Sequence, residues 1–117
     1  MAAPLQNYLR TYRRRSRFSQ EELALLLGSR SGTRVSRYER QVRKPTLETA
    51  LAYEAIFRVP VSTIFAGLYR KVEKETIARA EDLAERLVSA DTVRVSTRKL
   101  ASLRAISSRK PALRVNQ

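Results

Sequence analysis

The chain has 117 residues, with 24 Lys and Arg against 11 Asp and Glu, which gives a formal net charge of +13. This length fits one ordinary domain with an extension, and the basic excess favours a polyanionic partner such as nucleic acid. The absence of Cys excludes disulfides and thiolate metal sites, and the absence of His removes the commonest general base and metal ligand.

No apolar run approaches the ~20 residues that cross a membrane, and the N-terminus lacks a signal-peptide pattern, so a cytoplasmic protein is expected. The acidic residues are scattered among basic neighbours, and the three glycines form no phosphate-binding loop. We therefore expect neither an enzyme nor a protein that holds a metal or a cofactor.

Two helices are expected in the first 30 residues. The first runs from Leu5 to about Arg15, because apolar side chains recur there at helical spacing. The second begins at Ser19, which has Glu22 three residues on to complete a capping box, and Gly28 suits its end. The apolar residues expected to be buried on the second helix are Leu23, Leu26 and Leu27.

Three further helices follow in the same pattern. Ser31 is expected to cap a third helix that buries Val35 and Tyr38, and Thr46 after Pro45 is expected to cap a fourth. A break at Val59-Pro60 precedes a short fifth helix with Ser62 as its expected cap. Core and rim positions on the fourth helix are expected at Leu47, Ala50, Leu51, Glu54, Ala55 and Phe57.

Residues 5–66 resemble the Cro/repressor-like helix-turn-helix domain, the xenobiotic-response-element family of bacterial and phage regulators. The motifs that carry the resemblance are Ser19-Gln20-Glu21-Glu22-Leu23-Ala24, Leu27-Gly28, Val35-Ser36-Arg37-Tyr38-Glu39-Arg40 and Arg43-Lys44-Pro45. The resemblance implies an all-α, five-helix domain whose third helix enters the major groove of DNA. The chain departs from the family in two places: the turn before the third helix is one residue longer, and Gln41 stands where the family favours glycine.

Base contacts are expected from the first two turns of the third helix. With Ser31 as the cap, the exposed positions there are Gly32, Thr33, Arg34 and Arg37. Arg34 and Arg37 are three residues apart on one face, and arginine can donate two hydrogen bonds to guanine. The alternative for each arginine is a phosphate contact that carries no sequence information.

Phosphate contacts are expected at the helix starts and in the loop after the third helix. The residues are Ser19, Gln20, Ser31, Arg40, Arg43 and Lys44, and for Gln20 the resemblance implies a backbone contact. The resemblance also implies a bridge between Arg13 and Glu39 that locks the third helix to the scaffold. The alternative is two independent, solvent-exposed charges.

Beyond the resemblance, a long amphipathic helix is expected from Tyr69 to about Ala90, with a broad apolar face that either pairs with a second subunit or folds back. Its expected dimerisation residues are Val72, Ile77, Leu83 and Leu87. A short helix is expected from Thr97 to Ile106, and the basic segment 107–117 is expected to be disordered. The chain thus divides into a DNA-binding domain (5–67), a helical extension (68–106) and a tail.

These patterns predict a sequence-specific transcriptional regulator, such as a repressor, that binds double-stranded DNA as a homodimer. One alternative is the antitoxin of a toxin–antitoxin pair, which would regulate its own operon and bind a toxin through its C-terminal segment. Another is nonspecific coating of nucleic acid through charge alone, which the ordered helix-turn-helix pattern disfavours.

Overall fold

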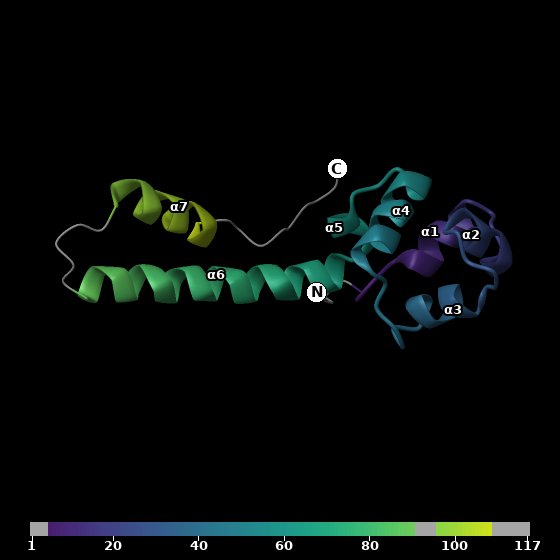
Figure 1. Ribbon diagram of the computed structural model, residues 1–117, viewed down its shortest axis with the longest axis horizontal. Coiled ribbons are helices and arrows are strands. Elements are labelled where there is room, and N and C mark those ends of the chain that lie inside the picture. Colours follow the sequence, from purple (N-terminus) through teal and green to yellow (C-terminus); the bar gives the residue numbers. More distant parts are fainter. Residues whose placement is uncertain (1–4, 91–95, 109–117) are drawn as a thin grey trace. The chain divides into compact units, whose positions relative to one another are not determined.

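The computed structural model describes residues 5–90 and 96–108, and this part of the chain contains helices and no strand (Figure 1). In chain order the helices are α1 (Leu9–Arg15), α2 (Gln20–Leu26), α3 (Thr33–Glu39), α4 (Leu47–Phe57), α5 (Val61–Ile64), α6 (Ala66–Ser89) and α7 (Thr97–Ser107). The chain divides into two compact units, and the division falls inside α6, between Tyr69 and Arg70. The expected all-α fold is confirmed.

The core of the first unit is built around Tyr53 of α4, whose side chain is fully buried. Its ring packs edge-on against Tyr38 and Phe65 at centroid distances of 6.3 and 6.5 Å, and it stacks on Phe57 at 5.9 Å. Such aromatic pairs add about 0.5–1.5 kcal/mol each beyond the area they bury. The buried cluster around Tyr53 consists of Leu9, Leu23, Ala24, Val35, Tyr38, Ala50, Ile64 and Phe65.

Local signals at three helix ends act as the sequence predicts. The Ser19 hydroxyl accepts the Glu22 N–H at 3.0 Å, and the Glu22 carboxylate accepts the Ser19 N–H at 2.9 Å. Thr46 caps α4 by accepting the Thr49 N–H at 3.2 Å. Gly28 follows α2 with φ +80°, a conformation that costs glycine nothing.

The first helix begins at Leu9, and the prediction that it begins at Leu5 is wrong. The segment before α1 is held instead by the backbone around the start of α6. The Tyr8 N–H donates to the Ile64 carbonyl at 2.7 Å, and the Gly67 N–H donates to the Leu5 carbonyl at 2.8 Å. This crossing is so close that a Cβ at Gly67 would overlap the backbone of residues 5 and 6.

Two predicted caps are also wrong, and in both places a glutamate from another helix bonds to the helix start. Gly32, not Ser31, is the N-cap of α3, and its N–H donates to the Glu21 carboxylate of α2 at 3.0 Å. Pro60, not Ser62, precedes α5, whose first N–H donates to Glu54 of α4 at 2.9 Å.

Burial on α2 and α4 differs in part from the expected pattern. Leu26, Leu47 and Leu51 were expected to be at or near the core but are 51%, 70% and 51% exposed. The buried positions are Leu23 and Ala24 on α2 and Ala50 and Tyr53 on α4; Leu23 and Ala50 agree with the prediction, and Ala24 and Tyr53 were not part of it. These residues lie on the helix faces that meet α1, α3 and α5, so helix packing rather than hydrophobicity alone selects the buried face.

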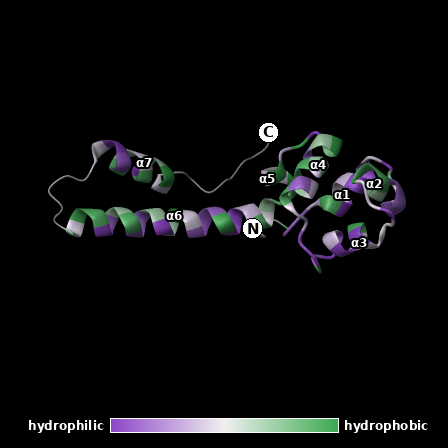
Figure 2. Ribbon diagram, viewed as in Figure 1, coloured by the Kyte–Doolittle hydropathy of each residue, from purple (hydrophilic) through white to green (hydrophobic). Residues whose placement is uncertain are grey.

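The second unit contains most of α6, together with α7. Apolar and polar residues alternate along α6 (Figure 2), which begins at Ala66, three residues before the expected start. Ala80 and Glu73 of α6 and Leu103 of α7 are buried, whereas Val72 and Leu83 are 48% and 45% exposed. The predicted helix at Thr97–Ile106 is confirmed as α7, with Ser96 accepting the Lys99 N–H at 3.3 Å.

The predicted disorder of residues 107–117 falls largely outside the described residues, of which Ser107 and Ser108 form the end of α7. Within the described ranges, no helix is long and apolar enough to span a membrane.

Candidate nucleic-acid interface

The exposed side of α3 carries Thr33, Arg34 and Arg37, while Val35 and Tyr38 on its other side are buried in the core. The predicted division of this helix into an exposed and a buried face is therefore confirmed for these residues. Gly32 is different because it is buried against the start of α2, where a Cβ would lie 3.0 Å from the Cβ of Gln20. The prediction that Gly32 is exposed is wrong, and it presents nothing to a groove.

The loop after α3 turns sharply and keeps its basic side chains in solvent. The Arg37 carbonyl accepts the Val42 N–H at 2.9 Å and the Arg43 N–H at 3.3 Å. Gln41 adopts φ +64°, the left-handed conformation that glycine adopts most easily. The turn leaves Arg40, Arg43 and Lys44 exposed.

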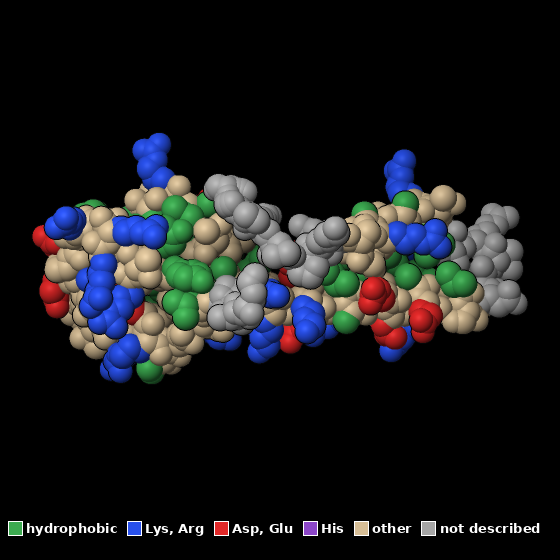
Figure 3. Space-filling model, turned by 180° about the vertical axis from the view of Figure 1, so that it is seen from behind, with side chains coloured by type: hydrophobic (Ala, Val, Ile, Leu, Met, Phe, Trp, Pro, Cys, Tyr) green, Lys and Arg blue, Asp and Glu red, His purple; other side chains and the backbone are tan. Residues whose placement is uncertain are grey.

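The charge of this region is almost purely positive. Between Gly28 and Thr46 the sequence has six basic residues and one acid, Glu39. The Glu39 side chain is only 3% exposed, so the solvent-facing charges of α3 and its flanking loops are all cationic. Basic side chains also gather on the face of the first unit seen in Figure 3. A surface of this kind attracts the phosphates of a duplex.

The buried carboxylate of Glu39 joins three helices. Arg13 of α1 donates to it twice, from Nε at 2.6 Å and from Nη2 at 3.1 Å, and Gln20 of α2 donates from Nε2 at 3.2 Å. The hydrogen bond to Glu39 raises the pKa of Arg13 and outweighs the opposing effect of its burial. Because the bridge is bidentate and largely buried, it fixes the end of α3 in orientation as well as in position.

Two further side chains, which the sequence pattern did not single out, hold α3 in place. Glu21 accepts the Gly32 N–H at the start of the helix. Asn7 donates from Nδ2 to the Tyr38 carbonyl near its end, at 3.1 Å, and its Oδ1 accepts the Leu9 N–H at 3.1 Å. The contacts with Gly32 and Tyr38 join residues far apart in the sequence, so no local signal could have revealed them.

Most of the predicted phosphate-binding groups at the helix starts bond to other groups of the protein or do not cap a helix. The Ser19 hydroxyl and backbone N–H are both engaged with Glu22, and the Glu21 carboxylate lies at the start of α3. Ser31 is exposed but caps nothing. Gln20 uses one amide hydrogen for Glu39 and retains a second one. Glu22 at the start of α2 and Glu21 at the start of α3 place negative charge where an anion would bind, and they disfavour phosphate binding there.

The charges of Glu39 and Arg13 act on Tyr53, whose hydroxyl is buried without a hydrogen-bond partner among the described residues. Burial raises its pKa well above the ordinary tyrosine value, and the negative charge of Glu39 acts in the same direction. The hydroxyl therefore stays neutral at physiological pH. We find no group of His, Cys, Asp or Glu in the described ranges that could hold a metal ion.

The helix-turn-helix family matches residues 9–64, just under half of the chain, and these residues span α1 to α5. This match supports a DNA-binding regulator. More particularly, residues 9–64 form a helix-turn-helix domain of the Cro/C1 type. The narrower assignment to the xenobiotic-response-element group stays a prediction. No curated protein and no solved structure matches the chain.

Proposed function

We propose that the protein recognises a specific DNA sequence through α3, with Thr33, Arg34 and Arg37 contacting base edges in the major groove. The observation that carries this proposal is that both arginines are exposed on a helix whose opposite face is buried and whose end is fixed by Glu39. A fixed helix holds its donors in one geometry, which bidentate recognition of guanine requires.

The phosphate backbone is bound, in this proposal, by the loop after α3. Arg40, Arg43 and Lys44 are exposed there, and Glu39, the one acid between Gly28 and Thr46, is buried. Gln20 adds its second amide hydrogen from the start of α2. These contacts set the orientation of the domain on the duplex, and they raise affinity without adding specificity.

We further propose that residues 5–67 form the DNA-binding domain and that residues 68–106 make the protein a dimer. A single recognition helix contacts few base pairs, and two of them spaced about 34 Å apart contact two half-sites. Exposed Val72 and Leu83 on α6 support a dimer interface, together with the half-buried Ile77 and Leu87. A DNA target in a regulator of this family also favours the cytoplasm.

The test is selection of bound sequences from random duplex DNA by the wild type and by Arg37→Ala. We expect the wild type to select one sequence with two half-sites. Arg37→Ala should bind it about 1–3 kcal/mol more weakly and lose its preference at one base position per half-site. Arg30→Ala is the matched control, because Arg30 is an exposed arginine in the loop before α3; its loss should weaken binding to all sequences alike and leave the base preference unchanged. A wild type without a preferred sequence would contradict the proposal.

The antitoxin function is a second candidate, and the exposed apolar side chains of α6 are what favour it, since a toxin would cover them as well as a second copy would. Co-expression with a small protein encoded beside it separates the two functions. An antitoxin forms a stoichiometric complex that suppresses the growth defect caused by that protein. A regulator without a toxin partner has no such effect and elutes as a homodimer.

A further inference from the structure

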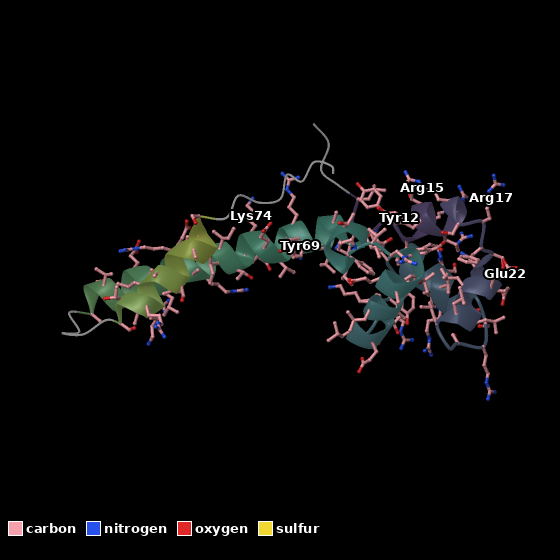
Figure 4. All side chains as sticks on the ribbon, turned by 90° about the horizontal axis from the view of Figure 1, so that it is seen from above. Tyr12, Arg15, Arg17, Glu22, Tyr69 and Lys74 are labelled. Atoms are coloured by element: carbon pink, nitrogen blue, oxygen red, sulfur yellow. The ribbon has the colours of Figure 1, made fainter. Side chains whose placement is uncertain are left out.

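The outer side of α1 and the turn after it carry four exposed arginines, Arg10, Arg14, Arg15 and Arg17, which we call the α1 arginine surface. Arg15 and Arg17 project from the same edge of the first unit (Figure 4). The fifth arginine, Arg13, points inward to Glu39. No acidic residue occurs before Glu21 in the sequence, so residues 1–20 contain no negative side chain to balance these arginines.

Ion pairs within the protein do not account for these charges. In the described part of the chain, the ion pairs within 4.0 Å involve Arg13 and Arg86 and no arginine of this surface. Arg10 and Arg14 are one helical turn apart, where like charges destabilise a helix. An external anion would offset this repulsion. Arg17 has φ +67°, a left-handed conformation that is unfavourable for residues other than glycine.

The α1 arginine surface is fixed relative to α3. Arg13 donates to the Phe18 carbonyl at 3.1 Å as well as to Glu39, so one side chain ties the α1–α2 turn to the end of α3. The guanidinium of Arg15 lies 5.6 Å from the centre of the Tyr12 ring, a cation–π contact that holds it in place. The turn then leads directly into Gln20 at the start of α2.

We propose that the α1 arginine surface binds the phosphate backbone of the same duplex, outside the base pairs that α3 contacts. This inference rests on the proposed function, because it assumes that α3 faces the groove. Guanidinium groups donate in pairs to phosphate oxygens, and four of them extend the basic surface of the α3 region along the strand. The surface contributes affinity for any sequence and no base preference.

The experiment compares two triple variants of the full chain that change the net charge equally. One is Arg14→Gln, Arg15→Gln, Arg17→Gln. The control is Arg98→Gln, Lys99→Gln, Arg104→Gln on α7, where all three residues are likewise exposed. Binding to a random-sequence duplex and to the selected operator is measured over a range of salt concentrations.

We expect the α1 variant to lower the slope of log affinity against log salt by about 2–3 units, because each phosphate that the protein neutralises contributes roughly 0.9 to that slope. Its ratio of operator to random affinity stays that of the wild type, and the α7 control changes the slope by less than about one unit. An unchanged slope in the α1 variant, or an equal fall in the control, would overturn the proposal.

A second triple variant, Arg14→Lys, Arg15→Lys, Arg17→Lys, keeps the positive charge. It shows whether a change in the glutamine variant is due to lost charge or to a disturbed fold. It should keep the wild-type slope, and a decrease as large as that of the glutamine variant would overturn the proposal. A failure of the proposed function can be told apart from a failure of this inference. If the proposed function is wrong, the wild type has no preference for an operator. The salt slopes test this inference separately, because they are also measured on random DNA.

Discussion

The two units of the chain use their apolar side chains differently. In the first unit Leu9, Leu23, Val35, Tyr53 and Ile64 are each buried completely. In the second, the least exposed apolar side chains are Ala80 at 6% and Leu103 at 9%, while the larger Leu83 and Val88 are 45% and 58% exposed. The first unit has a core of large side chains that are completely buried, although Leu26, Leu47 and Leu51 on its surface are exposed. The described part of the second unit contains no large apolar side chain that is completely buried. A partner that covers α6 would therefore supply the second unit with the core that its own helices lack.

Leu83→Asp is the substitution with the largest expected effect, because it tests whether the exposed side of α6 holds two copies together. We expect the dimer to dissociate and operator binding to weaken by about 2–5 kcal/mol, half of the ~4–10 kcal/mol that separates specific from nonspecific binding. Analytical ultracentrifugation and operator titration measure the two effects. Ala78→Asp, an exposed position about 140° around the helix, is the control. A variant that stays dimeric would locate the interface elsewhere.

Glu39→Ala tests how far the buried pair between Arg13 and Glu39 stabilises the first unit. Arg13, 12% exposed, would lose its carboxylate, and breaking so buried a pair lowers the free energy of unfolding by about 3 kcal/mol. Operator binding should weaken too, at temperatures where the variant is folded, because α3 is no longer fixed. Chemical denaturation measures the first effect. The control, Glu81→Ala on α6, removes an exposed acid and should change stability by less than about 0.5 kcal/mol. Equal stability of the two variants would show that the pair between Arg13 and Glu39 does not stabilise the fold.

Arg58→Gly tests the helix ends of the first unit. Arg58 follows α4 with φ +59°, and glycine there should stabilise the protein by about 0.5–1 kcal/mol. Gly28→Ala is the inverse test. At φ +80° an added Cβ meets no atom within 4 Å, so the loss of about 1 kcal/mol is due to the backbone alone. Melting curves that shift in the same direction for both variants would contradict this explanation.

Tyr53→Phe should have the smallest effect, a gain of a few tenths of a kcal/mol, because it removes a buried hydroxyl that lacks a partner. Burial raises the pKa of Tyr53 above the ordinary value of 10.0, so the hydroxyl ionises more readily in the unfolded chain, and the wild type loses stability as the pH rises above about 10. The advantage of the phenylalanine variant should therefore grow above pH 10. Denaturation at neutral and alkaline pH measures it, with Tyr69→Phe as the control. A clear loss of stability at neutral pH would show that the hydroxyl has a partner.

The sequence was sufficient where the signal is local. The caps at Ser19 and Thr46 involve residues three positions apart, and each was predictable because a helix start depends on its own first turn. The faces of α3 were predictable for the same reason, since Val35 and Tyr38 follow helical spacing. The bridge between Arg13 and Glu39 was predictable through the family resemblance alone, and the structure contains it.

The errors lie where a distant residue decides the local structure. Gly32 is buried because Glu21 and Gln20 of another helix occupy the space around it. Leu47 is exposed although leucine is strongly apolar, because α4 turns Tyr53 to the core instead. No periodicity within one helix contains this information, since it depends on how helices pack against one another.

The close crossing at Gly67 has a practical consequence for anyone who isolates the DNA-binding domain. The family match ends at residue 64, yet Gly67 and Leu68 donate their N–H groups to the carbonyls of Leu5 and Gln6. A fragment that ended at residue 64 would lose these two hydrogen bonds, and the carbonyls of Leu5 and Gln6 would lose the partners that Gly67 and Leu68 supply. The shortest fragment that retains them extends through the first turn of α6.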